Sequence, residues 1–87
     1  MIFISLSKMR KKPVKGTAEQ GSKIIDEFKN KGIKIIGWYW TLGRYDVAVI
    51  FEAANEKEAL KFSLGVSDIV ASETLVAIPR EEAIKLL

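Results

Sequence analysis

One stretch of the sequence decides the fold: Ile36-Gly37-Trp38-Tyr39-Trp40-Thr41-Leu42-Gly43-Arg44-Tyr45-Asp46-Val47. It holds both tryptophans and both tyrosines of the chain, together with two glycines and an Arg/Asp pair. Apolar and aromatic residues on either side of a glycine are typical of two strands joined by a tight turn. The stretch therefore predicts a β-hairpin, with strands over residues 33–42 and 45–53 and a two-residue turn at Gly43-Arg44.

The residues before the hairpin predict one strand and one helix. In residues 2–6, Ile and Leu side chains alternate with Phe3 and Ser5, and an alternation of period two is typical of a strand. Thr17, with Gln20 three residues later, has the spacing of a capping box and predicts the start of a helix. Gly32 predicts the end of that helix in a left-handed turn.

The residues after the hairpin predict two helices and a strand. Asn55, with Glu58 in the capping-box position, predicts the start of a second helix. Residues 70–78 predict a fourth strand, and Pro79 suits the first turn of a short closing helix. The order β-α-β-β-α-β predicts an α+β, ferredoxin-like fold, in which both main helices cover one face of an antiparallel sheet. We expect a single domain over residues 1–87.

The composition excludes several kinds of chemistry, because the chain has neither cysteine nor histidine. Disulfides, Cys/His zinc sites, histidine-dependent catalysis and histidine ligation of haem are all ruled out. The glycines are scattered rather than grouped in a phosphate-binding loop, and the spacing of Asp46, Glu52 and Glu73 supports no metal site. We therefore expect neither a cofactor nor a metal ion.

Five basic residues lie between Lys8 and Lys15, in a chain with a formal net charge of +3. Such a run is typical either of an anion- or nucleic-acid-binding patch or of a solvated loop. No aromatic residue is interleaved for base stacking, so we favour the loop and do not expect nucleic acid as a partner. No apolar stretch is long enough to span a membrane and no signal peptide is evident, so we expect a cytoplasmic protein.

The predicted hairpin register places apolar residues on both faces of the sheet. One face suits the two helices and carries Ile36, Trp38, Trp40, Leu42, Tyr45, Val47, Val49 and Phe51. The opposite face carries Ile35, Gly37, Tyr39, Thr41, Asp46, Ala48, Ile50 and Glu52, and we expect Ala71, Leu75 and Ala77 beside them.

No element of the chain is left to cover this second face. Exposed apolar area of this extent is typical of an interface. A chain of this length buries only about 60–65% of its unfolded surface, so self-association would also add to its stability. We expect a homodimer or higher oligomer that packs sheet against sheet.

Part of the hairpin has the sequence Gly37-Trp38-Tyr39-Trp40-Thr41-Leu42-Gly43-Arg44-Tyr45-Asp46-Val47. This segment resembles the signature of the GYD-domain family, small proteins of uncharacterised function. The later segment Ser72-Glu73-Thr74-Leu75 is similar to that family's last strand. The family is grouped with dimeric α/β-barrel proteins, in which two ferredoxin-like units bring their sheets together. The resemblance therefore implies the dimer. It implies no activity, because the wider group includes cofactor-independent oxygenases, isomerases, haem enzymes and effector-binding regulatory domains.

The candidate ligand-binding residues are Trp38, Tyr39, Trp40, Thr41, Arg44, Tyr45, Asp46 and Glu73. At the hairpin tip, Arg44 could hold a carboxylate or phosphate while Asp46 and Tyr39 exchange protons. The commoner role of such residues is to shape the turn, with Asp46 accepting hydrogen bonds from the backbone or from Arg44.

The tryptophans and Glu73 have two interpretations each. Trp38 and Trp40 could line a pocket for an aromatic ligand, although large aromatic residues on a strand more often belong to a core or an interface. Tyr39 and Thr41 lie on the opposite face, where they could project into a cavity of the dimer. Glu73 near that cavity would be a candidate base, because partial burial raises the pKa of a carboxylic acid; otherwise it pairs with a cation at the sheet rim.

Two classes of function remain. We expect a homo-oligomeric module that is structural or binds a small ligand near the hairpin aromatics. The alternative is a cofactor-independent enzyme, monooxygenase- or isomerase-like, that acts on a hydrophobic or aromatic small molecule. Its acid–base groups would be Tyr39, Asp46 and Glu73, and a cavity lined by at least two of them would favour the enzyme.

Overall fold

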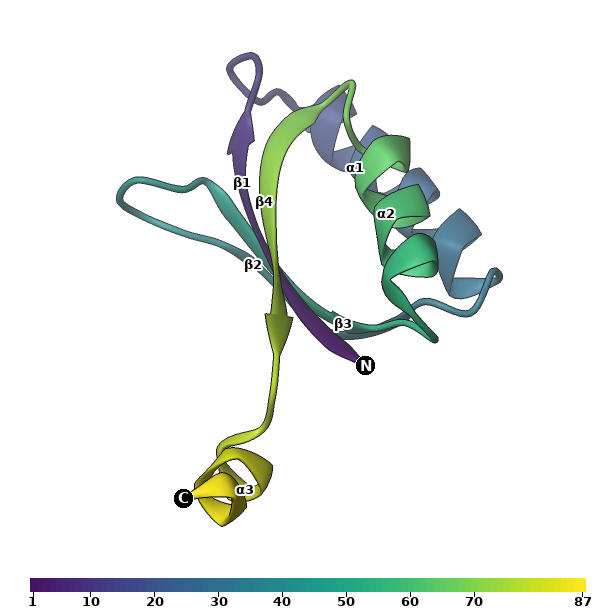
Figure 1. Cartoon of the computed structure of the whole chain (residues 1–87). Helices are drawn as coiled ribbons and strands as arrows, with labels where there is room; N and C mark the ends of the chain where they lie inside the picture. Colours follow the sequence, from purple (N-terminus) through teal and green to yellow (C-terminus); the bar gives the residue numbers. More distant parts are fainter.

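Four strands form one antiparallel sheet in the computed structural model, which describes all of residues 1–87. In chain order the elements are β1 (Ile2–Met9), α1 (Lys15–Lys29), β2 (Lys34–Trp40), β3 (Val47–Glu52), α2 (Glu56–Gly65), β4 (Val70–Ala77), α3 (Arg80–Ala83) and the 3-10 helix η1 (Ile84–Leu86). The strands lie in the order β2-β3-β1-β4, and α1 and α2 cover the same face (Figure 1). This arrangement confirms the predicted α+β, ferredoxin-like fold.

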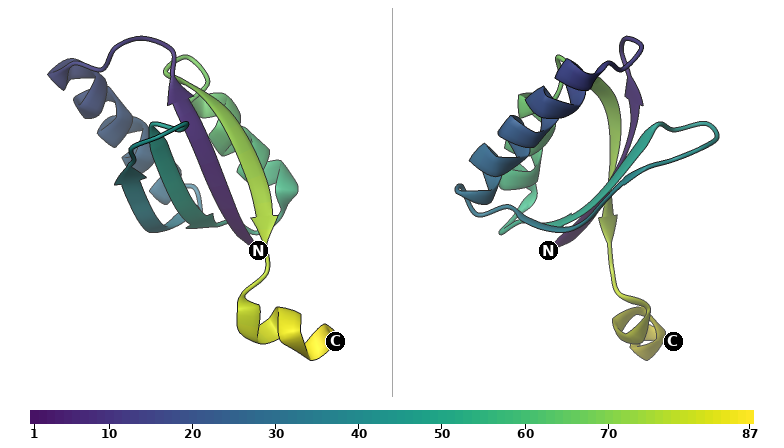
Figure 2. Two further views of the ribbon diagram at one scale, coloured as in Figure 1. Left: turned by 90° about the vertical axis from the view of Figure 1, so that its left-hand side faces the viewer. Right: turned by 180° about the vertical axis from the view of Figure 1, so that it is seen from behind.

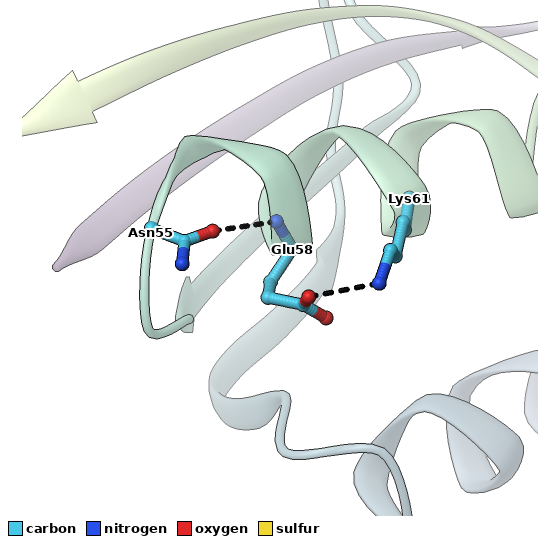
Figure 3. A network of polar contacts seen from close by, with 3 residues as sticks. All are labelled: Asn55, Glu58 and Lys61. Carbon is cyan, nitrogen blue, oxygen red and sulfur yellow. Dashed lines mark hydrogen bonds and ion pairs between the residues drawn. The ribbon is translucent and has the colours of Figure 1, made fainter.

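The two main helices begin differently. Asn55 caps α2 as predicted, because its Oδ1 accepts a hydrogen bond of 3.0 Å from the backbone N–H of Glu58, and Glu58 pairs with Lys61 at 2.9 Å (Figure 3). The predicted cap of α1 at Thr17 is wrong, since the helix begins two residues earlier. The hydroxyl of Thr17 instead turns back to accept from the backbone N–H of Val14 at 3.2 Å.

The end of α1 agrees with the prediction from Gly32. This glycine has a φ of +91°, a left-handed conformation in which a side chain would be strained. The backbone N–H of Ile33 donates to the carbonyl of Phe28, which closes the end of the helix. The chain thereby turns from α1 into β2 over four residues.

The core lies between the sheet and the two helices. It consists of nine buried apolar residues, Phe3, Ile25, Ile33, Val47, Val49, Phe51, Ala53, Ala59 and Phe62. Phe51 stacks on Phe3 with 5.4 Å between ring centroids and meets the edge of Phe62 at 4.9 Å. Phe28 joins Phe62 at 5.3 Å and connects α1 to α2.

The hairpin follows the predicted register from Trp40 back to Gly37. Trp40 lies opposite Val47 and Gly37 lies opposite Ile50, as expected. A β-bulge then follows, so that Ile35 lies opposite Phe51. The predicted position of Ile35 on the uncovered face is therefore wrong, because one extra residue in a strand turns the preceding side chains to the other face.

The connection between β2 and β3 is also longer than predicted. Both strands stop short of the expected bounds, and the chain turns through Leu42, Gly43, Arg44 and Tyr45 rather than through two residues. Gly43 has the expected positive φ, of +102°. Figure 2 shows that this hairpin extends beyond the rest of the sheet.

We call the sheet face turned away from α1 and α2 the far face. Residues on it alternate with buried, helix-facing residues such as Phe3 and Val49. Its apolar members are Ile2, Ile4, Leu6, Tyr39, Ala48, Ile50, Ala71, Leu75 and Ala77. No element of the chain covers this face (Figures 1 and 2), and the predicted positions of Tyr39, Ala48, Ile50 and the three β4 residues are confirmed.

The chain beyond β4 stands apart from both layers. The short helices α3 and η1 extend from the end of β4, away from the sheet and from α1 and α2 (Figure 1). Neither contains a buried residue, and Ile84, Leu86 and Leu87 are exposed. This segment therefore presents apolar side chains that pack on nothing within the chain. None of the helices is both long and apolar enough to cross a membrane.

Candidate functional site

Both tryptophans lie on the helix-facing side of the hairpin and border a cavity between α1 and the sheet. The cavity has a volume of about 350 Å³. Trp38, Trp40, Val47 and Val49 form its wall on the sheet, and α1 faces them from the other side. The prediction that Trp38 and Trp40 share the face toward the helices is confirmed.

The indole of Trp38 lies directly against α1. A Cβ atom added to Gly21 would be 3.7 Å from this indole, so the glycine permits a close approach of helix and ring without a clash. Trp38 nevertheless keeps 39% of its surface exposed and Trp40 keeps 57%. Two of the largest apolar side chains in the protein thus border the cavity rather than filling it.

Hydroxyl groups line the part of the sheet beneath α2. Ser5 and Ser7 are only 6% and 3% exposed. Ser7 Oγ lies 2.8 Å from Ser72 Oγ, and Ser5 Oγ lies 3.5 Å from both Ser7 Oγ and Thr74 Oγ1. These hydroxyls lie within hydrogen-bonding distance of one another, and Ser5 and Ser7 give the sheet wall of the cavity a polar strip.

No charged side chain lines the cavity. Its remaining lining residues are aliphatic or aromatic residues, a glycine, serines and a threonine. A charge placed inside would lose its hydration without gaining a counter-charge, which is costly. The cavity is therefore suited to uncharged, largely apolar chemical groups.

A second hollow adjoins the cavity at its hairpin end. Met9 and Trp40 line both spaces, and the second hollow also contains Arg10, Lys11 and Lys12 of the loop between β1 and α1. The guanidinium Nε of Arg10 donates to the backbone carbonyl of Ser67 at 2.7 Å, which fixes the loop against the connection between α2 and β4. The basic run predicted as a solvated loop thus lies beside the cavity.

The hairpin tip is held by hydrogen bonds of Thr41 and Asp46. The hydroxyl of Thr41 donates to the carbonyl of Tyr45 at 2.6 Å, and its N–H donates to the carbonyl of Asp46 at 2.8 Å. Asp46 Oδ2 accepts from the backbone N–H of Met9 at 2.8 Å. These contacts match the turn-shaping interpretation of Asp46.

Tyr45 and Glu73 form a pair on the far face. The phenol of Tyr45 donates to Glu73 Oε2 at 2.7 Å, and Glu73 alternates along β4 with Ser72 and Thr74, which face the helices. This hydrogen bond is the main cause that raises the pKa of Tyr45 above its ordinary value of 10.0, while the nearby Arg44 acts in the opposite direction. The prediction that Tyr45 faces the helices is therefore wrong.

Comparison with protein families matches the GYD domain over residues 1–87, the whole chain. The chain belongs to the GYD-domain family. Comparison with curated proteins finds no match. The resemblance in the hairpin sequence is thus confirmed, and the function of the GYD domain is unknown.

The predicted site residues of this GYD domain fall into three places. Trp38 and Trp40 line the cavity, whereas Tyr39 and the Tyr45–Glu73 pair lie on the far face. The remaining three, Thr41, Arg44 and Asp46, lie at the hairpin tip. No cluster of three or more Asp or Glu side chains that could hold a metal ion occurs in the GYD domain.

Sequence reasoning missed several residues of the cavity, among them Ser5 and Ser7. The serines alternate with Ile4 and Leu6, a pattern that favours serines in water and aliphatic residues inside, yet the serines face the helices. A signal was present in β4, where Ser72 and Thr74 have the same alternation. Pairing β4 with β1 in the predicted sheet would have indicated a face that carries hydroxyl groups.

Proposed function

We propose that this GYD-domain protein is a homodimeric module that binds a small hydrophobic molecule in the cavity between α1 and the sheet. The cavity carries the proposal. Its volume of about 350 Å³ falls in the range of about 300–1,000 Å³ that is typical of small-molecule sites. A few hydroxyl groups among apolar walls are also the usual composition of such sites.

The cavity is partly open to solvent, since Trp38 and Trp40, which border it, are both exposed. Apolar side chains that line such a space lack packing contacts on one side. The domain has only nine buried apolar residues in its core. A bound molecule would supply the missing contacts to Trp38 and Trp40, which supports a ligand over a packing defect.

The far face supports the homodimer. Nine apolar residues on it meet solvent in the single chain, among them Tyr39, Ile50 and Leu75. A second copy packed sheet to sheet across a two-fold axis would cover this area. The apolar side chains of α3 and η1 would find a partner in the same assembly, because these helices extend from the edge of the sheet.

The geometry favours binding over the enzyme alternative. None of Tyr39, Asp46 and Glu73 lines the cavity. A molecule held there would meet hydroxyl groups and indoles, but no carboxylate, ammonium or phenol that could transfer a proton in the ordinary pH range. We therefore propose a binding module rather than a cofactor-independent enzyme.

A fluorescence titration with phenylnaphthylamine, an uncharged aromatic probe, tests the proposed site. Gly21→Leu places a side chain beside Trp38 in the cavity, whereas Gly16→Leu is its matched control, because a Cβ there meets nothing within 4 Å. We expect saturable binding of one probe per chain, weakened at least about tenfold by Gly21→Leu and unchanged by Gly16→Leu. Absence of saturable binding, or equal binding by both variants, would overturn the proposal.

A further inference from the structure

We infer that the ligand is an amphiphilic anion, whose apolar part occupies the cavity and whose acidic group lies at the basic loop Arg10–Lys12. This inference rests on the proposed binding site and specifies its ligand class. The carrying observation is that the uncharged cavity and the basic hollow share two wall residues, Met9 and Trp40. The two spaces therefore adjoin each other, and the inferred ligand extends from one into the other.

The inner part of such a ligand must be uncharged. No Asp, Glu, Lys or Arg side chain lines the cavity, so an ionised group inside would have no counter-charge. The indoles of Trp38 and Trp40 offer flat apolar surfaces, which suit an aromatic ring system or a short aliphatic chain. The serine hydroxyls can donate to, or accept from, a single neutral oxygen or nitrogen atom on this part.

The outer part meets a different environment. The second hollow holds three cationic side chains, Arg10, Lys11 and Lys12, against one carboxylate, that of Asp46. Asp46 already accepts from the backbone N–H of Met9, and neither lysine forms an ion pair within the chain. Two ammonium groups are thus free to meet an anion in the hollow that adjoins the cavity.

The position of the basic loop strengthens the electrostatic preference for an anion over a neutral or cationic molecule. The loop leads directly into the N-terminal end of α1, whose first turn contains no acidic residue. The dipole of this 15-residue helix adds partial positive charge at the same end. A carboxylate, sulfonate or phosphate attached to an apolar body is therefore favoured over a neutral or cationic molecule of the same shape.

Two probes that share one aromatic skeleton test the charge of the ligand separately from the existence of the binding site. Anilinonaphthalene sulfonate carries a permanent negative charge, and phenylnaphthylamine is the same aromatic amine without the sulfonate. The test variant is Lys11→Gln/Lys12→Gln. The matched control is Lys29→Gln/Lys57→Gln, which removes the same charge where α1 ends and α2 begins, outside the lining of both hollows.

We expect the anionic probe to bind the wild-type protein more tightly than the neutral one. The Lys11→Gln/Lys12→Gln variant should weaken only the anionic probe, by about five- to tenfold as expected for two exposed ion pairs, and added salt should do the same. The control variant should leave both affinities unchanged.

The outcomes distinguish the two proposals. If the neutral probe binds as tightly as the anionic one, or if both double variants lower the anionic affinity equally, the anionic ligand class is wrong while the cavity remains a binding site. If neither probe binds, the proposed function fails and the inferred ligand class fails with it. Loss of the anionic probe alone in Lys11→Gln/Lys12→Gln supports the inference.

Discussion

The phenol of Tyr45 donates a hydrogen bond of 2.7 Å to Glu73 Oε2, although another strand of the sheet lies between the segments that carry the two residues. Tyr45 precedes β3, Glu73 lies on β4, and β1 runs between these strands. The bond therefore crosses β1 on the far face, beside Leu6, which pairs with Glu73. It ties the turn of the projecting hairpin to the opposite edge of the sheet.

The first prediction concerns the alkaline titration of Tyr45. Its phenol donates to a carboxylate, so its pKa in the folded protein lies above the ordinary value of 10.0. The stabilising contribution of this bond is present below about pH 10 and is lost as the pH rises through the higher folded pKa. In a titration followed by tyrosinate absorbance, the wild-type protein should thus show a late step, in which one tyrosine ionises at a pH above the ordinary value of 10.0.

Two variants assign that late titration. Glu73→Gln removes the carboxylate charge and should move the late step to lower pH, while Tyr45→Phe should delete it. An unchanged titration curve in Glu73→Gln would contradict the pairing of Tyr45 with Glu73.

The second prediction separates a structural role of Asp46 from a catalytic one. Asp46 Oδ2 accepts from the backbone N–H of Met9, so Asp46→Ala leaves this donor without its partner. We expect a loss of about 1–2 kcal/mol in the free energy of unfolding, measured by urea denaturation. Asp46→Asn retains an acceptor oxygen and should lose less. Equal stability of wild type and Asp46→Ala would show that the hydrogen bond does not hold the tip.

The third prediction concerns the contact between the two main helices. A Cβ atom on Gly65 of α2 would collide with the ring of Phe28 from α1. Gly65→Ala should therefore cost about 1–3 kcal/mol of stability through overpacking, even though alanine favours helix more than glycine does. Gly16→Ala, where a Cβ meets nothing within 4 Å, should retain or gain stability, by up to about 1 kcal/mol. The opposite ranking in urea denaturation would be inconsistent with this helix packing.

The fourth prediction addresses self-association through the far face. Ile50 lies near the middle of this face on an inner strand, and Leu60 is an equally apolar but exposed residue of α2. Light scattering of the wild type should give twice the chain mass of 9.7 kDa. Ile50→Glu should weaken the dimer by at least about 100-fold, since it places an unpaired charge in an apolar interface.

Leu60→Glu serves as the control for that change, because it adds the same charge on the helix side of the molecule. It should leave the dimer intact, and circular dichroism should show both variants folded. A wild-type protein that scatters as a 9.7 kDa monomer would remove the basis for the homodimer.

Much of the architecture follows from short-range signals in the sequence. The positive-φ glycines Gly32 and Gly43 and the cap at Asn55 are local features, and each of the three is found where it was predicted. The hairpin register is correct between Gly37 and Trp40. It fails at Ile36, because nothing in a run of β-branched residues reveals which one is the extra residue of a bulge.

The candidate site was less accessible to sequence reasoning, because it depends on which face of each strand meets the helices. Trp38 and Trp40 were placed correctly, since the longer turn keeps the predicted pairing of these residues with Val49 and Val47. Ser5 and Ser7 point inward against the usual rule that polar residues face water, and only the pairing of β1 with β4 explains them. The Tyr45–Glu73 bond joins the hairpin turn to β4, two segments distant in sequence, so no spacing could indicate it.

The indole N–H signals of Trp38 and Trp40 offer the most direct measurement, because these are the only tryptophans and both line the cavity. In an NMR titration of the wild-type protein with phenylnaphthylamine, we expect both indole signals to shift saturably with a single dissociation constant. Indole signals that stay fixed, while amides of far-face residues such as Ile50 shift or nothing shifts, would contradict a ligand site between α1 and the sheet.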